Sequence, residues 1–227
     1  MTVVARSLLV VALGIACAVG GVSPTHASDY PKQARHSTEL TLAQKARVTD
    51  ALRRQGATGR QVRAILDDRA AAEQVAVESV RMTSRRVDRP GYYRVNGKRA
   101  FCVTHKSLVT KVVQKSVVGI TLFSVTLTTS VCQQGYTSNG TRLIKKRTYA
   151  RWFSNTPLRG WELESWYGKV DKLADCQMRS GERWCRTYDA QTGAKVVSPG
   201  IKGVRQIFYV VVKNHYNSRG EKGTWSS

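Results

Sequence analysis

The sequence predicts a mainly β protein: a disulfide-bonded antiparallel β-sandwich, or open barrel, preceded by a short N-terminal helical hairpin. From Gly91 onward, short apolar segments recur at close spacing between Gly and Asn turn residues, a pattern typical of sandwiches and barrels. Residues 41–83 instead show apolar side chains at helical spacing. Four cysteines follow an N-terminal export signal, and an even number in an exported chain indicates disulfides.

Residues 1–27 have the three parts of a cleavable signal peptide. Arg6 supplies the positive charge, residues 7–22 are uncharged and mostly apolar, and residues 25–27 include the small side chains that signal peptidase requires. The apolar run falls short of the ~20 residues that a membrane span needs. Lipidation at Cys17 is the alternative, although the residues before it fit a lipobox poorly. We therefore expect a secreted mature chain without a membrane span.

The mature chain begins with a polar stretch, residues 28–40, that we interpret as a flexible leader. The helical hairpin, residues 41–83, follows. Thr41 and Thr58 each stand three residues before a glutamine, which is the spacing of a helix capping box. We expect the second helix to run to about Met82. The hairpin is either permanent or a pro-segment that is removed after folding.

Residues 84–90 are predicted to be a linker, because Pro90 disfavours helix in the residue before it. The β-sandwich domain then spans residues 91–227. Asn96-Gly97 is the strongest short hairpin signal in the chain. The expected strands are 92–95, 98–104, 108–114, 119–132, 141–153, 161–167, 184–188 and 204–213.

Two of these strands have informative patterns. Along residues 119–132 apolar side chains alternate with Ser and Thr, except that Leu122 is out of phase, which predicts a β-bulge there. Residues 207–212 are apolar without interruption. That pattern predicts a central strand covered on both faces.

The four mature cysteines allow three disulfide pairings. We favour Cys102–Cys132 and Cys176–Cys185, since each joins neighbouring segments. Cys102 and His105 have the spacing of metal ligands, but no second close pair completes a zinc site. We therefore predict no metal.

Charge is the strongest compositional signal. The whole chain carries a net +22, and residues 88–227 contain 24 basic and 8 acidic residues, a net +16. Such a field attracts polyanions. Outside a cell these are wall polymers, acidic lipid surfaces, acidic polysaccharides and released DNA. The alternative is a surface that serves only solubility or adaptation to the medium.

The chain lacks a recognisable catalytic constellation. Its histidines beyond the signal, His36, His105 and His215, lie in no nucleophile or metalloprotease motif, and there is no phosphate-binding glycine loop. We predict no cofactor and favour a non-enzymatic protein. Glu162 and Glu164 could pair as the acid and base of a hydrolase. Alternatively they form ion pairs with a neighbouring basic strand.

A basic cluster on the strand 141–153 is the predicted binding site. Alternatively, charge on both faces protects an edge strand from aggregation. Three nearby tryptophans either stack on sugar rings or bases or are buried in the core. The predicted polyanion-binding cations are Arg142, Lys145, Lys146, Arg147 and Arg151, and the possible stacking aromatics are Trp152, Trp161 and Trp166.

The segment 119–168 has a distinctive order of features: Gly-Ile-Thr-Leu-Phe at 119–123, Cys132 closing that strand, a turn, a basic strand, Gly160-Trp161 and Gly168. In this order the chain resembles a loose group of small secreted β-sandwich proteins of high-GC Gram-positive bacteria. That group has a tryptophan where this chain has Val131. The resemblance implies a secreted β-sandwich and no particular activity.

Together these features predict a secreted, strongly basic, non-enzymatic protein that binds anionic cell-wall or other extracellular polymers. The alternative is a secreted toxin or enzyme inhibitor, for which a disulfide-stapled sandwich supplies a rigid scaffold. A hydrolase is the less favoured third possibility.

Overall fold

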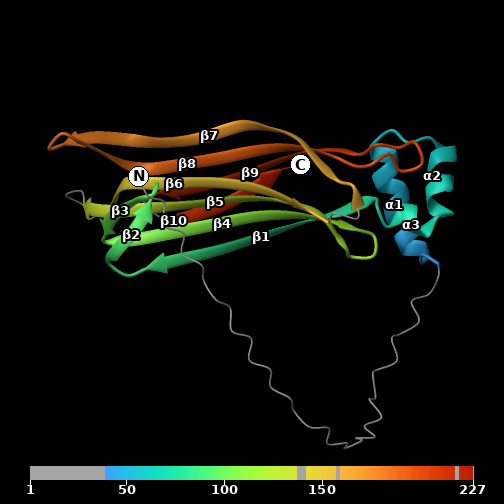
Figure 1. Ribbon diagram of the computed structural model, residues 1–227, viewed down its shortest axis with the longest axis horizontal. Coiled ribbons are helices and arrows are strands. Elements are labelled where there is room, and N and C mark those ends of the chain that lie inside the picture. The colour runs from blue at the N-terminus through green and yellow to red at the C-terminus, as the bar shows by residue number, and fades with distance from the viewer. Residues whose placement is uncertain (1–38, 137–141, 157–158, 218–219, 227) are drawn as a thin grey trace, which may run out of the picture. The chain divides into compact units, whose positions relative to one another are not determined.

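An antiparallel sheet of eight strands dominates the structure (Figure 1). The computed structural model describes residues 39–136, 142–156, 159–217 and 220–226. The predicted signal peptide and most of the predicted leader lie outside the described residues. The sheet strands are β1 (Ala76–Asp88), β4 (Thr104–Ser116), β5 (Thr121–Tyr136), β6 (Arg142–Asn155), β7 (Glu162–Arg179), β8 (Glu182–Val197), β9 (Ile207–Asn217) and β10 (Gly220–Ser226).

The sheet folds into a sandwich that is nearly a closed barrel. Its order is β1-β4-β5-β6-β8-β9-β10, and β7 pairs with β8. One half is therefore β1-β4-β5-β6 and the other is β7-β8-β9-β10. Among the described residues the strand ladder passes from one half to the other at a single pair, Ile144 with Cys185. The inner faces of the two halves share one hydrophobic core. The predicted fold class is confirmed.

Strand β5 shows how the sequence pattern builds this core. Phe123, Val125 and Leu127 are fully buried, as the alternation predicts. On β4, Gln114 pairs with Phe123 and Lys115 pairs with Thr121, so Leu122 is an extra residue in the ladder. The predicted bulge is confirmed, and it allows Leu122 to be buried as well.

Both predicted disulfides are confirmed. Cys102–Cys132 joins the hairpin of β2 (Gly91–Val95) and β3 (Lys98–Cys102) to β5. Cys176–Cys185 links directly paired residues of β7 and β8. The predicted turn between β2 and β3 is also confirmed, since Asn96 and Gly97 both have positive φ, as a type I′ turn requires.

The helical region is shorter than predicted. It consists of α1 (Leu42–Arg54), α2 (Gly59–Leu66) and α3 (Arg69–Ala72). The capping boxes at Thr41 and Thr58 are present. The continuation to Met82 is wrong, and so is most of the predicted linker, because residues 76–88 form β1 and pair with β4. Spaced Ala and Val residues suit either structure, and the partner strand β4 decides between them.

The helices have a small core of their own. Leu52, Ile65 and Ala72 are fully buried and pack with Ile201 and Val204, which precede β9. Leu40, which was assigned to the flexible leader, is buried in the same cluster. The helices thus seal one end of the sandwich, opposite the β2–β3 hairpin (Figure 1).

The prediction that residues 207–212 are covered on both faces is wrong. Val210 and Val212 face the core and are buried, whereas Tyr209 is 55% exposed. Strand β9 is central only within its sheet, between β8 and β10. No second layer covers the outer face of β9 in the described part of the chain, so that face remains open to solvent.

A polar cluster locks the two halves of the sandwich together. The Asn214 amide on β9 donates to the main-chain carbonyls of Leu108 (3.1 Å) and Leu127 (3.3 Å), which lie in the opposite half. The same amide contacts the Thr129 hydroxyl at 2.9 Å and accepts a 2.6 Å hydrogen bond from Thr110 Oγ1. All of these side chains are buried. The cluster therefore specifies how the sheets face each other.

Candidate anion-binding surface

The predicted basic cluster on β6 is not one open patch. Lys145 forms an ion pair with Glu182 at 2.5 Å, and Arg147 forms one with Asp171 at 2.6 Å. The guanidinium of Arg151 lies 4.7 Å from the centre of the Trp166 ring. These three cations therefore fasten β6 to the β7–β8 half of the sandwich.

The other two predicted cations occupy different positions. Arg142 is exposed at the start of β6. Lys146 is half-buried and pairs with Cys132, so it lies next to the disulfide that holds the β2–β3 hairpin. β6 pairs along its length with β5 but with β8 only at Ile144, which fits the alternative interpretation of a charged edge strand.

The three tryptophans also separate. Trp161 is fully buried, and its indole N–H donates to the carbonyl of Gln74 at 3.3 Å, so its predicted stacking role is wrong. Trp166 is partly buried and covered by Arg151. Trp152 is 50% exposed and remains available for contact.

Glu162 and Glu164 are exposed on β7. Glu164 forms a 2.9 Å ion pair with Lys195 of the neighbouring strand β8, so the alternative interpretation of a cross-strand ion pair is confirmed for Glu164, with β8 and not the strand 141–153 as its partner. The reason is topological, because β7 pairs with β8. A register shift at Glu164 also interrupts the simple alternation on which the acid–base hypothesis depended.

The β2–β3 hairpin forms an exposed surface. In this segment the sequence predicted the turn at Asn96-Gly97 but no binding surface. Its inner face carries Val95, Ala100 and Cys102, which are buried against β5. Its outer face is formed by two directly opposed pairs, Tyr92 with Phe101 and Arg94 with Arg99. All four outer side chains are exposed. The tyrosine is 65% exposed and its ring packs edge-on against Phe101 at 5.4 Å.

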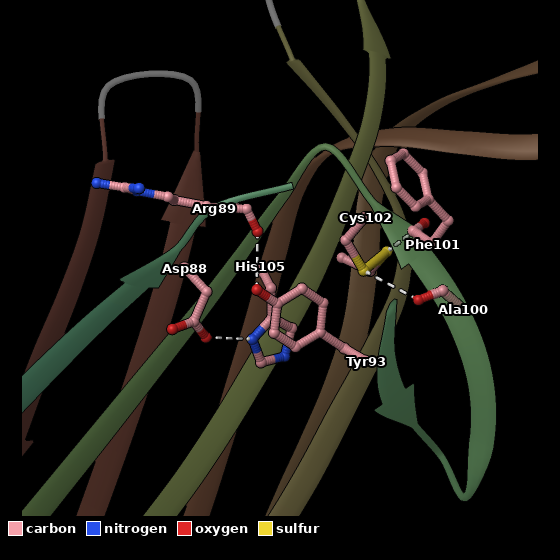
Figure 2. Close-up of a disulfide and its surroundings, with 8 residues drawn as sticks. Asp88, Arg89, Tyr93, Ala100, Phe101, Cys102 and His105 are labelled. Atoms are coloured by element: carbon pink, nitrogen blue, oxygen red, sulfur yellow. Dashed lines mark hydrogen bonds and ion pairs between the residues drawn. A yellow bond between two sulfur atoms is a disulfide. The ribbon is translucent and has the colours of Figure 1, made fainter. Parts of the chain in front are cut away.

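A compact set of contacts anchors this hairpin to the sheet (Figure 2). The Tyr93 ring stacks on His105 with centroids 4.3 Å apart, and the Tyr93 hydroxyl donates to the Arg89 carbonyl at 2.7 Å. His105 Nδ1 lies 3.0 Å from Asp88 Oδ2. The disulfide Cys102–Cys132 holds the second strand. The outer face is thus displayed on a fixed support.

The hairpin is electrostatically one-sided. Residues 89–102 contain Arg89, Arg94, Lys98 and Arg99 and no acidic residue. In the described ranges, none of these four side chains forms an ion pair with a carboxylate, although Arg99 lies over the Tyr92 ring at 4.4 Å. Several acidic residues elsewhere are paired with bases, as in Arg47–Glu78, Lys106–Glu221 and Lys202–Asp68. The hairpin therefore presents uncompensated positive charge beside exposed aromatic rings.

The contact between Asp88 and His105, which helps to anchor the hairpin, should weaken in acid. Hydrogen bonds from His105 and then Arg86 lower the pKa of the Asp88 carboxyl. A carboxyl whose pKa is lowered by folding stabilises the fold above its unfolded pKa of about 4, and this contribution is lost as pH falls through the folded value. We expect Asp88→Asn to destabilise the protein at pH 7 and to have a much smaller effect near pH 2.

Urea unfolding of both proteins at several pH values checks this expectation. The matched control is Asp67→Asn, which alters an exposed carboxylate. A destabilisation by Asp88→Asn that stays constant between pH 7 and pH 2 would contradict the role of the charged carboxylate.

In the part of the chain that the structure describes, no group of three or more His, Cys, Asp or Glu side chains could hold a metal ion. Cys102 is in a disulfide, and His105 lies between Tyr93 and Asp88. No helix among the described residues is long and apolar enough to cross a membrane.

Fold and surface together define a class: a disulfide-bonded antiparallel β-sandwich with an anchored basic, aromatic hairpin at one end. Comparisons of the chain with protein-family models, with curated proteins and with solved structures found no match. The signal for the hairpin was present in the sequence, as an aromatic and a basic residue two positions apart on each side of the turn, Tyr92 with Arg94 and Arg99 with Phe101, and no acid over residues 89–102.

Proposed function

We propose that the mature protein is a secreted, non-enzymatic binding protein that associates with anionic polymers of the cell wall or the extracellular medium. The observation that carries the proposal is the outer face of the hairpin, where Arg94 and Arg99, which have no acidic partner among the described residues, lie beside exposed Tyr92 and Phe101. Two disulfides are typical of proteins in oxidising compartments, which agrees with the expected export.

A purely solubilising role explains the hairpin less well. Dispersed charges are sufficient for solubility, whereas Arg94 and Arg99 directly oppose each other in one ladder. Like charges in opposed positions destabilise a sheet. Exposed aromatic side chains beside them add nothing to solubility but are common in binding surfaces. The arrangement therefore favours an anionic partner that compensates the charge.

The test is co-sedimentation of the oxidised protein, residues 28–227, with isolated Gram-positive cell walls. We expect retention that falls with salt, because released counterions drive such binding, and that disappears when the anionic polymers are stripped from the walls. No retention at low salt would refute the proposal and direct attention to protein targets, as for a toxin or inhibitor.

Matched charge variants locate the surface. Replacing Arg89, Arg94, Lys98 and Arg99 with Gln should abolish most retention and reduce the slope of log affinity against log salt by about 3, at ~0.7–0.9 per phosphate contact. The control removes four exposed cations from α1 and α2, Arg53, Arg54, Arg60 and Arg63. Equal losses in the two variants would show that net charge alone governs retention.

A further inference from the structure

The outer face of the β2–β3 hairpin has the shape and chemistry of a specific subsite. A hollow of about 410 Å³ is lined by Tyr92, Arg94 and Arg99 of the outer face, by Gly97 of the turn and by Tyr93, whose ring also stacks on His105. Gly97 adds no side chain to it, because its positive φ of 73° belongs to the turn and favours glycine. The hollow is larger than one small anion needs. It has room for an anionic group together with a neighbouring ring.

The two arginines define the charge of the occupant. Arg94 and Arg99 are directly opposed across the hairpin, and no carboxylate of the described residues pairs with either. Guanidinium groups bind phosphate and carboxylate oxygens through paired hydrogen bonds. A phosphodiester directs its oxygens tetrahedrally and can bridge the guanidiniums of two arginines that are direct neighbours on one face of a hairpin. A planar carboxylate directs both of its oxygens within one plane and suits a single guanidinium better.

The aromatic side chains define the neighbouring group. The Tyr92 and Phe101 rings are inclined at 69°, and Arg99 lies over the Tyr92 ring. The pair therefore lacks the parallel, open ring faces on which successive nucleic-acid bases stack. A single open aromatic surface next to a phosphate group suits a sugar ring attached to the same polymer.

We propose that the outer face of the β2–β3 hairpin binds a sugar-bearing phosphodiester polymer, with Arg94 and Arg99 gripping one phosphate and Tyr92 packing against the adjoining sugar. This inference rests on the proposed polyanion-binding function and specifies its subsite and ligand chemistry. The ion-paired cations of β6 then serve the fold, and the hairpin provides recognition.

The test compares four polymers of similar length by isothermal titration calorimetry at low salt. They are glycosylated poly(glycerol phosphate), unglycosylated poly(glycerol phosphate), polygalacturonate and single-stranded oligothymidylate. We expect the glycosylated phosphate polymer to bind at least tenfold more tightly than polygalacturonate or the oligonucleotide. Equal affinity for all four, or tighter binding of polygalacturonate or oligothymidylate, would overturn the assignment.

Variants assign the two parts of the subsite. Arg94→Gln combined with Arg99→Gln should weaken binding of both phosphate polymers by about 10- to 100-fold, whereas the control pair Arg60→Gln and Arg63→Gln should change it less than threefold. Tyr92→Ala should remove only the advantage of the glycosylated polymer. An Arg94/Arg99 variant that binds like the control would refute the subsite.

Thermal melting separates binding from folding. Without polymer, the Arg94/Arg99 double variant should melt at the same or a higher temperature, because it loses a repulsive pair. A lower melting temperature would refute the claim that the pair is uncompensated in the free protein. Binding of every polymer with equal salt sensitivity would refute the subsite alone. Failure of the unmodified protein to bind any of them would refute the proposed function itself.

Discussion

Replacement of Asn214 by alanine is expected to lower the free energy of unfolding by about 3–5 kcal/mol. The amide of Asn214 contacts the Leu108 and Leu127 carbonyls and the Thr129 hydroxyl from the opposite half of the sandwich. Alanine would remove these hydrogen bonds and also the acceptor of the buried Thr110 hydroxyl, although Thr129 keeps its contact with the Tyr216 hydroxyl. Each buried polar group left unsatisfied costs ~1–3 kcal/mol. A cavity left by the missing amide adds to the loss.

Equilibrium unfolding in guanidinium chloride, followed by tryptophan fluorescence, measures this effect. The matched control is Lys213→Ala, one residue earlier on β9 and exposed, which should change stability by less than about 0.5 kcal/mol. A loss below about 1 kcal/mol for Asn214→Ala would mean that water replaces the amide and that the cluster does not lock the halves.

Removal of the Cys102–Cys132 disulfide by replacing both cysteines with alanine should cost about 4 kcal/mol. Its cysteines are 30 residues apart, and the entropy of closing a loop of that length in the unfolded chain gives this magnitude. The same replacement of Cys176 and Cys185, which are 9 residues apart, should cost about 3 kcal/mol. Unfolding curves of the two variants test whether the first disulfide contributes more to the free energy of unfolding than the second.

The first disulfide also carries a functional expectation. Without Cys102–Cys132 the hairpin keeps only the Tyr93–His105 stack and the few contacts around it. Amide hydrogen exchange over residues 91–102 should then become faster, and affinity for the phosphate polymers should fall because their ligand groups lose their fixed positions. The Cys176–Cys185 variant serves as the control. Unchanged exchange in the hairpin would show that the stack alone anchors it.

Strands with strict alternation were predictable from local sequence. In β5, side chains at every second position are buried, and the out-of-phase Leu122 correctly marked the bulge. The Asn96-Gly97 turn has such narrow backbone requirements that its sequence identifies it. The helix starts at Thr41 and Thr58 could also be predicted from the sequence, because a capping box is a contact between residues three positions apart.

Elements that depend on distant partners were not predictable in this way. Residues 76–88 form β1 because β4 offers them a full ladder, although their apolar spacing also suits a helix. The apolar pattern of residues 207–212 predicted burial on both faces, but Tyr209 is exposed because none of the described residues forms a layer over the outer face of β9. In each case the local pattern fits two structures, and a tertiary contact selects one of them.

At the candidate site, too, some features could be predicted from local sequence and others depended on tertiary contacts. The basic run on β6 was the most visible charge cluster, yet Lys145 and Arg147 are used in ion pairs with Glu182 and Asp171, which only folding brings near. The hairpin cations give a weaker sequence signal, because there are four of them between residues 89 and 99 against five on β6. Their isolation from acids is a property of the folded surface.

The sequence by itself determined the fold class and the excess positive charge, because these follow from periodicity and composition, and the spacing of the cysteines favoured the two pairs that the structure forms. Only the tertiary structure decided which cations are neutralised, which aromatics are buried, and where the uncompensated charge meets exposed rings. The physical reason is that charge compensation and burial depend on neighbours distant in the chain. The indole N–H of Trp161 donates to the carbonyl of Gln74, 87 residues away in the chain, whereas Arg94 and Arg99 oppose each other without a carboxylate partner among the described residues.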